Sequence, residues 1–184
     1  YHNSEDNRIK VDFSMHAEYT SQEKMVRSLA EVAQEHGHNI QVHVSETVKE
    51  TEECRQRHHG LSPTAYLAQC GIFDVPATAA HCVHVTPDDI DILREKSVTV
   101  ATCPKSNLKL ASGVAPILDM LKAGVNVALG TDSVASNNNL NFIEEMRIFS
   151  LLHKGISGDP TAITPAQALH IASKAGAVSQ GRKD

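Results

Sequence analysis

The positions of hydrophobic residues follow two alternating periods along most of the chain. Runs in which aliphatic residues recur at every second position predict strands, and stretches in which they recur at spacings of three and four predict amphipathic helices. The predicted strands are residues 9–15, 39–45, 77–83, 97–103 and 126–131. Because helical stretches separate them, we expect a parallel sheet in which each helix forms a right-handed crossover.

Helix start signals and apolar stripes support the helices between these strands. Thr20 with Glu23 and Thr47 with Glu50 have the spacing of a capping box. A capping hydroxyl also precedes a proline at Ser62-Pro63, Thr86-Pro87 and Thr164-Pro165. Core-facing stripes are predicted from Phe142, Met146, Phe149 and Leu152 in residues 139–154, and from Met25, Leu29 and Val32 in an earlier helix.

The two faces of the predicted strands differ, which helps to choose between an open doubly wound sheet and part of a (β/α)8 barrel. In residues 40–44 the aliphatic side chains share one face, and Gln41 and His43 share the other. In residues 125–132 the second face carries small and polar residues only, namely Asn126, Ala128, Gly130 and Asp132. An open sheet covered by helices on both sides should be apolar on both faces, so the pattern favours a barrel.

The number of strands then limits how much of a barrel is present. A closed (β/α)8 barrel needs eight strands and typically about 250 residues, whereas this chain has 184 residues and five predicted strands. The chain also begins with Tyr1 rather than Met and opens on a polar stretch without periodicity. The chain is therefore either an open α/β sheet or part of a (β/α)8 barrel with about three strands upstream. We favour the barrel, of which these would be strands four to eight.

Composition and charge exclude several classes of partner. The chain is long enough for one domain with a real core, because 41% of its residues are hydrophobic. Its net charge of −5 is mild and dispersed, so nucleic acid is not an expected partner. No apolar run approaches the roughly 18 residues of a membrane span. The four cysteines form no CxxC pair, and we expect reduced thiols in a cytoplasmic protein.

Three polar clusters follow predicted strands at their carboxyl ends. They are His43-Val44-Ser45-Glu46, Ala80-His81-Cys82-Val83-His84 and Gly130-Thr131-Asp132-Ser133. Taken singly, a strand-end histidine is more often structural, and an aspartate after Gly-Thr is a natural helix cap. Because ligands of parallel α/β folds bind at the carboxyl ends of the strands, the three clusters together predict one functional site.

The residue types in these clusters suit metal-assisted hydrolysis. Neutral imidazole and carboxylate are ligands appropriate to Zn²⁺ or Fe²⁺. A bound metal can lower the pKa of its water to about 7. Glu46 lies three residues beyond His43, where a carboxylate can move a proton without being a ligand.

Four segments carry a family resemblance. HVSET, AAHCVHV, CPKSNLKLASGVAP and GTDSVASNNNL, in this order, resemble consecutive signatures of the amidohydrolase superfamily. More narrowly, they are similar to the 5-methylthioadenosine/S-adenosylhomocysteine deaminase group, which is close to the chlorohydrolase-like enzymes. The similarity runs from Val11 to about Gly176. It implies a distorted barrel that holds one divalent metal, zinc in the first place and iron as the alternative, and a small-molecule purine nucleoside as substrate.

The resemblance also implies roles for individual residues. The family holds its metal with an HxH pair on the first strand, a histidine on the fifth and an aspartate on the eighth, which would be His43 and Asp132 here. The catalytic residues would be Glu46, His81 and Asp132, with Glu46 moving a proton to the ring nitrogen of the base. His16, Glu46 and Ser136 would contact the substrate.

The chain departs from the family pattern in several places. Its HxH sequence, His36-Gly37-His38, lies at a helix end and reads as a turn, so the first-strand ligands are missing. We therefore expect residues 1–184 to be the C-terminal portion of the barrel, without the first strands and the family's β-sandwich. We expect this portion to bind metal weakly or not at all and to be inactive alone. Glu18 stands where relatives commonly have proline, a change expected to be minor, and His58-His59 reads as a solvated surface pair.

Two further expectations concern function and assembly. The parent protein would deaminate an adenine-type nucleoside; the alternatives are guanine deamination, triazine dechlorination, or a non-catalytic open α/β module that binds a small molecule at its strand ends. The first strand of the chain should have an unpaired edge, which favours pairing between chains and hence a homo-oligomer.

Overall fold

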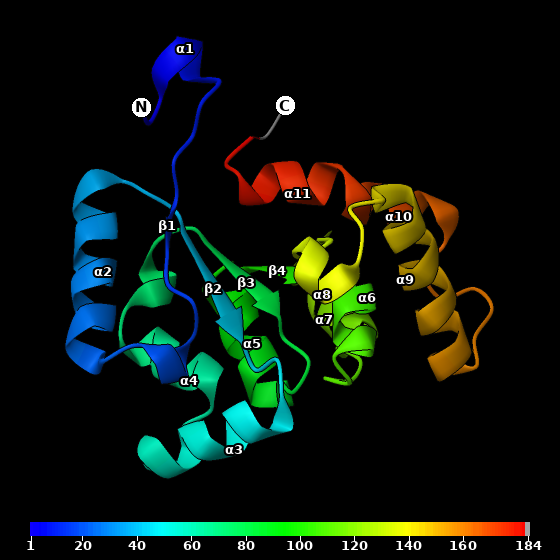
Figure 1. Ribbon diagram of the computed structural model, residues 1–184, viewed down its shortest axis with the longest axis horizontal. Helices are drawn as coiled ribbons and strands as arrows, with labels where there is room; N and C mark the ends of the chain where they lie inside the picture. The colour runs from blue at the N-terminus through cyan, green and yellow to red at the C-terminus, as the bar shows by residue number, and fades with distance from the viewer. Residues whose placement is uncertain (183–184) are drawn as a thin grey trace.

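Five parallel strands form a single sheet in the computed structural model, which describes residues 1–182 (Figure 1). Residues 183 and 184 of the predicted domain lie outside the described part. The strands are β1 (Phe13–Ser14), β2 (Ile40–Val44), β3 (Ala77–His81), β4 (Thr99–Thr102) and β5 (Asn126–Leu129). Each predicted strand is present, but the first is shorter than expected, because only Phe13 and Ser14 pair with β2.

The order of the strands distinguishes the two architectures that the sequence leaves open. Every strand lies beside its predecessor in the order β1-β2-β3-β4-β5. A doubly wound sheet reverses its order at a switch point, whereas a barrel adds each strand on the same side of the last. The faces also differ as predicted, since Val42 is buried, Gln41 is exposed and His43 is half-buried. The prediction of a partial barrel is confirmed.

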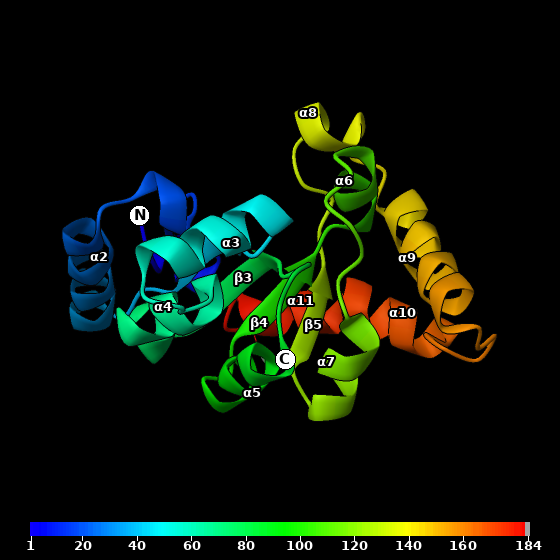
Figure 2. The ribbon, with the colours of Figure 1, turned by 90° about the horizontal axis from the view of Figure 1, so that it is seen from below.

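Helices connect the strands and surround the sheet. Between strands lie η1 (Glu18–Thr20), α2 (Glu23–His36), α3 (Val48–Arg57), α4 (Pro63–Gln69), η2 (Ile72–Asp74), α5 (Pro87–Glu95), α6 (Pro104–Lys109) and α7 (Ile117–Ala123). The short turn α1 (Ser4–Asn7) precedes β1, and α8 (Val134–Asn137), α9 (Phe142–Ser157), α10 (Pro165–Ala172) and α11 (Lys174–Ser179) follow β5. Figure 2 shows α2 and α4 at one side of the sheet and α9 and α10 at the other. No helix in the described residues has the length and apolar character needed to cross a membrane.

Most of the predicted helix caps are present. The capping box of Thr47 and Glu50 opens α3, and Ser62, Thr86 and Thr164 each accept a backbone hydrogen bond at the start of α4, α5 and α10. The capping box predicted from Thr20 is wrong. The hydroxyl of Thr20 accepts instead from the backbone N–H of Ala17 within η1 (3.2 Å), and α2 begins after Gln22.

The core-facing stripe of α2 is displaced by one residue from its predicted position. Met25 and Val32 are 57% and 40% exposed, so the prediction is wrong for both, although Leu29 packs against the core. The buried positions of α2 are Val26, Ala30 and Ala33. Two of these three residues are alanines, and an alanine gives only a weak hydrophobic signal in sequence.

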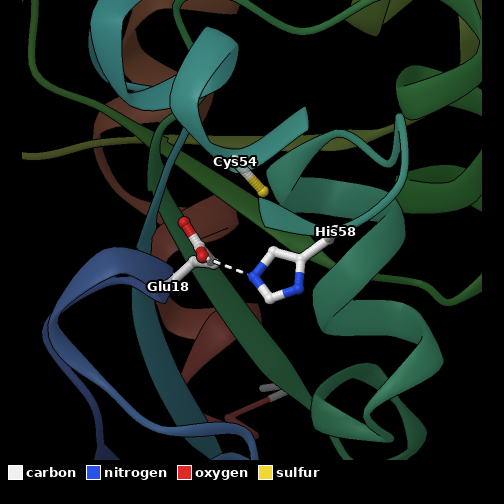
Figure 3. A group of neighbouring side chains, drawn as sticks. All are labelled: Glu18, Cys54 and His58. Carbon is white, nitrogen blue, oxygen red and sulfur yellow. Dashed lines mark hydrogen bonds and ion pairs between the residues drawn. The ribbon is translucent and has the colours of Figure 1, made fainter. Parts of the chain in front are cut away.

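A buried carboxylate joins the loop after β1 to the end of α3. Glu18 is 2% exposed, and its two oxygens accept from Arg57 Nε (3.0 Å) and Arg57 Nη2 (2.7 Å). His58 Nε2 lies 2.6 Å from Glu18 Oε1 (Figure 3). His58 is therefore not solvated as predicted, although His59 is exposed. The position of Glu18, expected to matter little, anchors a long-range ion pair.

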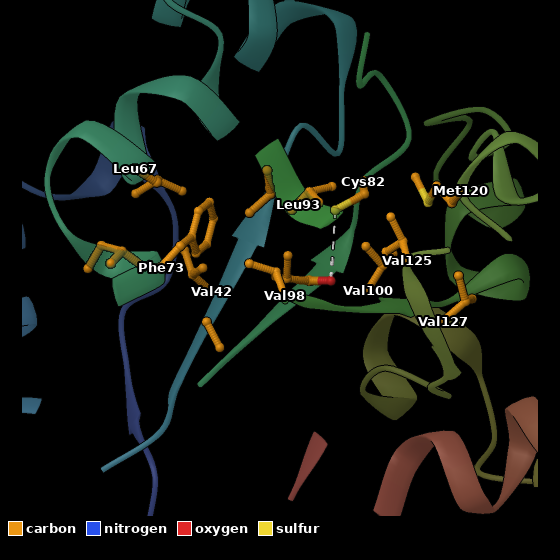
Figure 4. Close-up of a cluster of buried hydrophobic side chains, with 14 of the residues drawn as sticks. Val42, Leu67, Phe73, Cys82, Leu93, Val98, Val100, Met120, Val125 and Val127 are labelled. Carbon is orange, nitrogen blue, oxygen red and sulfur yellow. Dashed lines mark hydrogen bonds between the residues drawn. The ribbon is translucent and has the colours of Figure 1, made fainter. Parts of the chain in front are cut away.

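The main hydrophobic core lies between the sheet and the helices of its outer face. Figure 4 shows buried side chains of the strands, such as Val42, Val100 and Val127, alongside Leu93 of α5 and Met120 of α7. Leu93 and Met120 are both fully buried. Strand residues with aliphatic side chains on one face thus bury that face against the crossover helices, which leaves the other face for the candidate site.

We expect Leu93→Ala to lower the free energy of unfolding by about 2–5 kcal/mol, because it leaves a cavity at a closely packed position. The control is Leu151→Ala on α9, where the side chain is 58% exposed and the change should stay within about 0.5 kcal/mol. Urea denaturation of the 184-residue chain measures both. Equal losses in the two variants would contradict the assignment of the core.

The Glu18 ion pair should stabilise the fold only where its carboxylate is ionised. Burial alone would raise the pKa of Glu18, but the hydrogen bonds from Arg57 and His58 and the charge of Arg57 outweigh it, so the pKa lies below its ordinary value of 4.5. The contribution of Glu18 to the free energy of unfolding is therefore fully present above the pKa of the unfolded state. It is lost as the pH falls through the lower pKa of the folded state.

We expect Glu18→Gln to cost about 1–3 kcal/mol at pH 7, because Arg57 and His58 lose a charged acceptor. The difference from wild type should shrink when unfolding is measured near pH 3. Glu53→Gln is a matched control, since Glu53 also pairs with Arg57 (3.5 Å) but is 45% exposed, and its effect should stay below about 1 kcal/mol. A Glu18→Gln difference that does not change with pH would show that the carboxylate is not ionised in the folded chain.

Candidate active site

Histidines from three strand ends lie in a row at the carboxyl edge of the sheet. His43 lies in β2 opposite Ala80, and His81 is the last residue of β3. The two rings are stacked with centroids 5.2 Å apart. The exposed ring of His16, just after β1, lies 5.0 Å from the ring of His43. The structure therefore brings together the first two predicted clusters and the predicted substrate contact from β1.

The backbone is unusual at the turns that carry these side chains. Ser45, His81 and Asp132 have φ values of 50°, 69° and 61°. This left-handed region costs a residue other than glycine about 1–3 kcal/mol. At functional sites it points a side chain in a direction that a regular strand does not allow. The same conformation occurs in turns elsewhere in the chain, so a positive φ does not by itself indicate a functional site. The evidence for a site comes from the side-chain contacts at these turns.

A hydrogen bond fixes the orientation of His43. Its Nδ1 lies 2.6 Å from the backbone oxygen of His16. A carbonyl oxygen can only accept, so the proton of a neutral ring stays on Nδ1 and Nε2 keeps its lone pair. This arrangement is typical of metal-binding histidines, whose other nitrogen donates to an oxygen.

His81 is held in the same manner by a side chain from α6. His81 is 2% exposed, and its Nδ1 lies 2.8 Å from Oδ1 of the buried Asn107. Nε2 is therefore free on the other side of the ring, where it lies 3.9 Å from Oε2 of Glu46. The histidine and the carboxylate that the sequence proposed as catalytic thus face each other.

A second buried carboxylate holds the turn that carries Glu46. Glu50 accepts from the backbone N–H of Ser45 with Oε1 (3.0 Å) and from that of Glu46 with Oε2 (2.7 Å). Burial raises the pKa of Glu50, although these backbone hydrogen bonds oppose the shift. Glu46 itself is half-buried, so it lies between the protein interior and the open side of the site.

Asp132 follows β5 and is ionised at neutral pH. Its Oδ2 accepts from Ser106 Oγ (2.6 Å) and its Oδ1 from the backbone N–H of Ser133 (2.6 Å). Burial would raise the pKa of Asp132, but these hydrogen bonds, together with nearby His81 and His43, hold it below its ordinary value of 3.8. The position of Asp132 suits a carboxylate that binds a cation.

Ser136 is a predicted site residue without a side-chain hydrogen bond to the others in the described part of the chain. It lies half-buried on α8. Sequence reasoning in turn missed Ser106 and Asn107, which orient Asp132 and His81. Both belong to the signature segment CPKSNLKLASGVAP, so a signal was present, but their partners are 26 residues away along the chain.

A different group has the closest set of ligand atoms. Among the described residues, the three side chains whose ligand atoms all lie within 4.8 Å of one another are Glu18, Cys54 and His58. The guanidinium of Arg57 already neutralises Glu18, and burial together with the charge of Glu18 raises the pKa of the Cys54 thiol to about 12. This group is therefore a structural ion pair with a neutral thiol beside it. The thiols of Cys82 and Cys103 are also buried, and burial raises the pKa of both.

Comparisons with known proteins agree with this geometry. Two curated relatives are 5-methylthioadenosine/S-adenosylhomocysteine deaminases. The one from Acetivibrio thermocellus is 50% identical over 179 residues, and the one from Pelotomaculum thermopropionicum is 47% identical over 179 residues. Each alignment covers 97% of this chain but 41% of the relative, so the chain spans well under half the length of these proteins.

Solved structures show the same arrangement of elements. An adenosine deaminase from Xanthomonas campestris with bound zinc superposes with a TM-score of 0.93 at 33% identity, over 99% of this chain and 41% of that one. A guanine deaminase from C. acetobutylicum has a TM-score of 0.89 at 23% identity, over 97% of this chain and 44% of that one. An atrazine chlorohydrolase from Arthrobacter aurescens has a TM-score of 0.89 at 22% identity, over 99% of this chain and 40% of that one. The last two show a shared fold.

The sequence profile of the Amidohydrolase family extends the match to the whole chain. It covers residues 1–184, including every strand end described above. The family signatures, the strand order and the side chains at the carboxyl edge of the sheet therefore have one explanation: the chain belongs to the amidohydrolase family.

Proposed function

We propose that this chain supplies strands four to eight of a longer barrel, which hydrolytically deaminates an adenine-type nucleoside. The observation that carries the proposal is the convergence of His43, His81 and Glu46 at one edge of the sheet, with an ionised Asp132 near both histidines. The names of the relatives from Acetivibrio thermocellus and Xanthomonas campestris support an adenine-type substrate. In this proposal residues 1–184 are the C-terminal part of the barrel, and other residues of the full-length parent complete the site.

His43 and Asp132 fit a divalent metal by the chemistry of their donor atoms. His43 presents a neutral Nε2, and Asp132 presents an ionised carboxylate; both are ligands that zinc accepts. Zinc is the first choice because the adenosine deaminase from Xanthomonas campestris has it bound, and iron is the alternative. Such an ion would act as a Lewis acid that lowers the pKa of water to about 7. The remaining ligands would be the family's HxH pair, from outside this chain.

The chain's own residues then carry the proton transfers. His81 Nε2, freed by the bond to Asn107, accepts a hydrogen bond from the attacking water, and the Asp132 carboxylate orients it. Glu46 takes a proton from this water and passes it to the ring nitrogen next to the carbon that bears the amine. A C–O bond forms at that carbon. The second proton of the water then passes to the amine, the C–N bond breaks, and ammonia leaves while the new oxygen becomes a carbonyl. His16 and Ser136 contact the rest of the substrate.

The rival functions have weaker support. Guanine deamination and triazine dechlorination rest on neighbours at 23% and 22% identity, which share the fold. A non-catalytic open α/β module does not fit a strand order without a switch point. Four free, buried cysteines support a cytoplasmic location for the parent protein.

We predict that the full-length parent releases ammonia from adenosine, methylthioadenosine or S-adenosylhomocysteine. It should release neither ammonia from guanine nor chloride from a chlorotriazine. Glu46→Gln should lower kcat by about 10²–10⁴-fold, because it removes the group that moves the proton. Glu52→Gln, an exposed carboxylate on α3, is the matched control and should leave kcat unchanged. The 184-residue chain alone should show no turnover, since it holds two of the metal ligands. Ammonia release from guanine alone, or chloride release from the chlorotriazine alone, would remove the proposed substrate class.

We also predict that the isolated chain associates through the free edge of β1. The backbone N–H groups of Phe13 and Met15 bond to the strand beside them, so that of Ser14 points to the open edge. Light scattering should show a dimer or larger assembly. Ser14→Pro should weaken this association, because it removes the N–H at the open edge and leaves the β1–β2 hydrogen bonds intact. A wild-type chain that stays monomeric at all concentrations would contradict this prediction.

A further inference from the structure

We propose that Glu145, a buried carboxylate on α9, is a positioning residue that fixes both Asp132 and His81 through two separate hydrogen-bonded routes. The proposal rests on the function proposed above, because it assigns Glu145 to the same site. Glu145 touches neither the predicted metal ligands nor the predicted substrate contacts. It acts through residues of α6 and α8 that in turn hold the reacting side chains.

The surroundings of Glu145 are unusual for a carboxylate. Its side chain is fully buried, with an exposed fraction of 0%. In the described part of the chain its hydrogen-bond donors are the backbone N–H of Lys105 (2.8 Å) and the amide Nδ2 of Asn137 (2.8 Å), both neutral. The ammonium of Lys105 pairs instead with the neighbouring Glu144 (3.0 Å). Burying a carboxyl group is costly unless its oxygens are hydrogen-bonded. The two contacts meet this requirement and join α9 to α6 and α8.

The first route runs through α6 and reaches both reacting side chains. Oε1 of Glu145 accepts from the backbone of Lys105 in the first turn of this short helix. The next two residues are Ser106, which donates to Asp132, and Asn107, which accepts from His81. Both are buried, at 0% and 2% exposure. Since they are adjacent on one helix, a displacement of its first turn would move Asp132 and His81 together.

The second route runs through α8 to the backbone just before Asp132. Nδ2 of Asn137 donates to Oε2 of Glu145 and also to the carbonyl oxygen of Thr131 (2.6 Å). Thr131 precedes Asp132, whose backbone is in the left-handed region. Asn137 is fully buried, and its Oδ1 lacks a hydrogen-bond partner. The amide thus leaves its own acceptor unsatisfied to direct both hydrogens at Glu145 and Thr131, as expected if these two contacts hold the turn.

Through the two routes, Glu145 connects the segments that hold Asp132 and His81, whose relative position the reaction requires. A displacement of about 1 Å in a catalytic group can cost about 10²-fold in rate. Residues that orient metal ligands from behind typically contribute about 10–100-fold in metal affinity or activity. Glu145 therefore matters for the relative position of Asp132 and His81 more than for substrate binding.

The test compares Glu145→Gln with Glu144→Gln in the full-length parent. Glutamine at 145 presents an NH2 group to one of the two donors, so one route is lost while the volume is kept. We expect both zinc affinity, from competition with a chromophoric chelator, and kcat to fall by about 10–100-fold, with KM changed less than about 3-fold. Glu144 contacts the side chains of Lys105 and Asn139, and its variant should stay within about 2-fold of wild type in all three quantities.

Other outcomes separate positioning from simple stabilisation. A Glu145→Gln parent with a lower Tm but unchanged zinc affinity would overturn the proposal, as would a kcat within about 2-fold of wild type. If that variant does not fold, Asn137→Ala cuts only the second route and should lower zinc affinity and kcat in the same direction; unchanged values there would also overturn it. A wild-type parent without deaminase activity would refute the proposed function alone, because the ratio of zinc affinities in the two glutamate variants still decides the role of Glu145.

Discussion

The carboxyl ends of parallel strands meet at one edge of a sheet, and this constraint produces the candidate site. His16, His43, His81 and Asp132 come from the ends of four strands that are far apart in sequence. Because strand order follows sequence order, each βα unit adds its carboxyl end beside the previous one. One face of the strands is aliphatic and packs against the crossover helices, so the polar side chains are directed to the other face. A site of this kind needs no single long motif.

Buried carboxylates then fix the loops that the sheet brings together. Glu50 holds the turn that carries Glu46, and Glu145 holds the start of α6 and the turn before Asp132. Glu18 joins the loop after His16 to the end of α3. Each accepts hydrogen bonds with both oxygens, which limits the cost of burying the carboxyl group. His43 and His81 lie at strand ends, and Glu46 and Asp132 lie just after strands. The carboxyl groups of Glu50 and Glu145, which hold these segments, are buried in the first turns of α3 and α9.

Local patterns in the sequence predicted what depends on local physics. Alternating aliphatic residues located all five strands, and the caps at Thr47, Ser62, Thr86 and Thr164 were correct because each cap is a contact within one turn. The cap at Thr20 failed because a competing turn uses its hydroxyl. The stripe on α2 failed because tertiary contact, and not side-chain size, decides which of its residues are buried.

Long-range partners could not be read from the sequence. Arg57 lies 39 residues from Glu18, and Glu145 lies 40 residues from Lys105. No periodicity connects such pairs, so His58 looked like a surface residue and Glu145 like an ordinary helix residue. The identities of the strand-end residues were accessible because the sheet itself specifies where they meet. The residues that orient them became visible only with the fold.

In the proposed function His43 and Asp132 bind one metal ion at the carboxyl edge of the sheet. Anomalous diffraction from crystals of the zinc-loaded, full-length parent tests it directly. We expect a zinc peak about 2.0–2.2 Å from Nε2 of His43 and from a carboxylate oxygen of Asp132. A peak among Glu18, Cys54 and His58, with none beside His43, would contradict the assignment of the site.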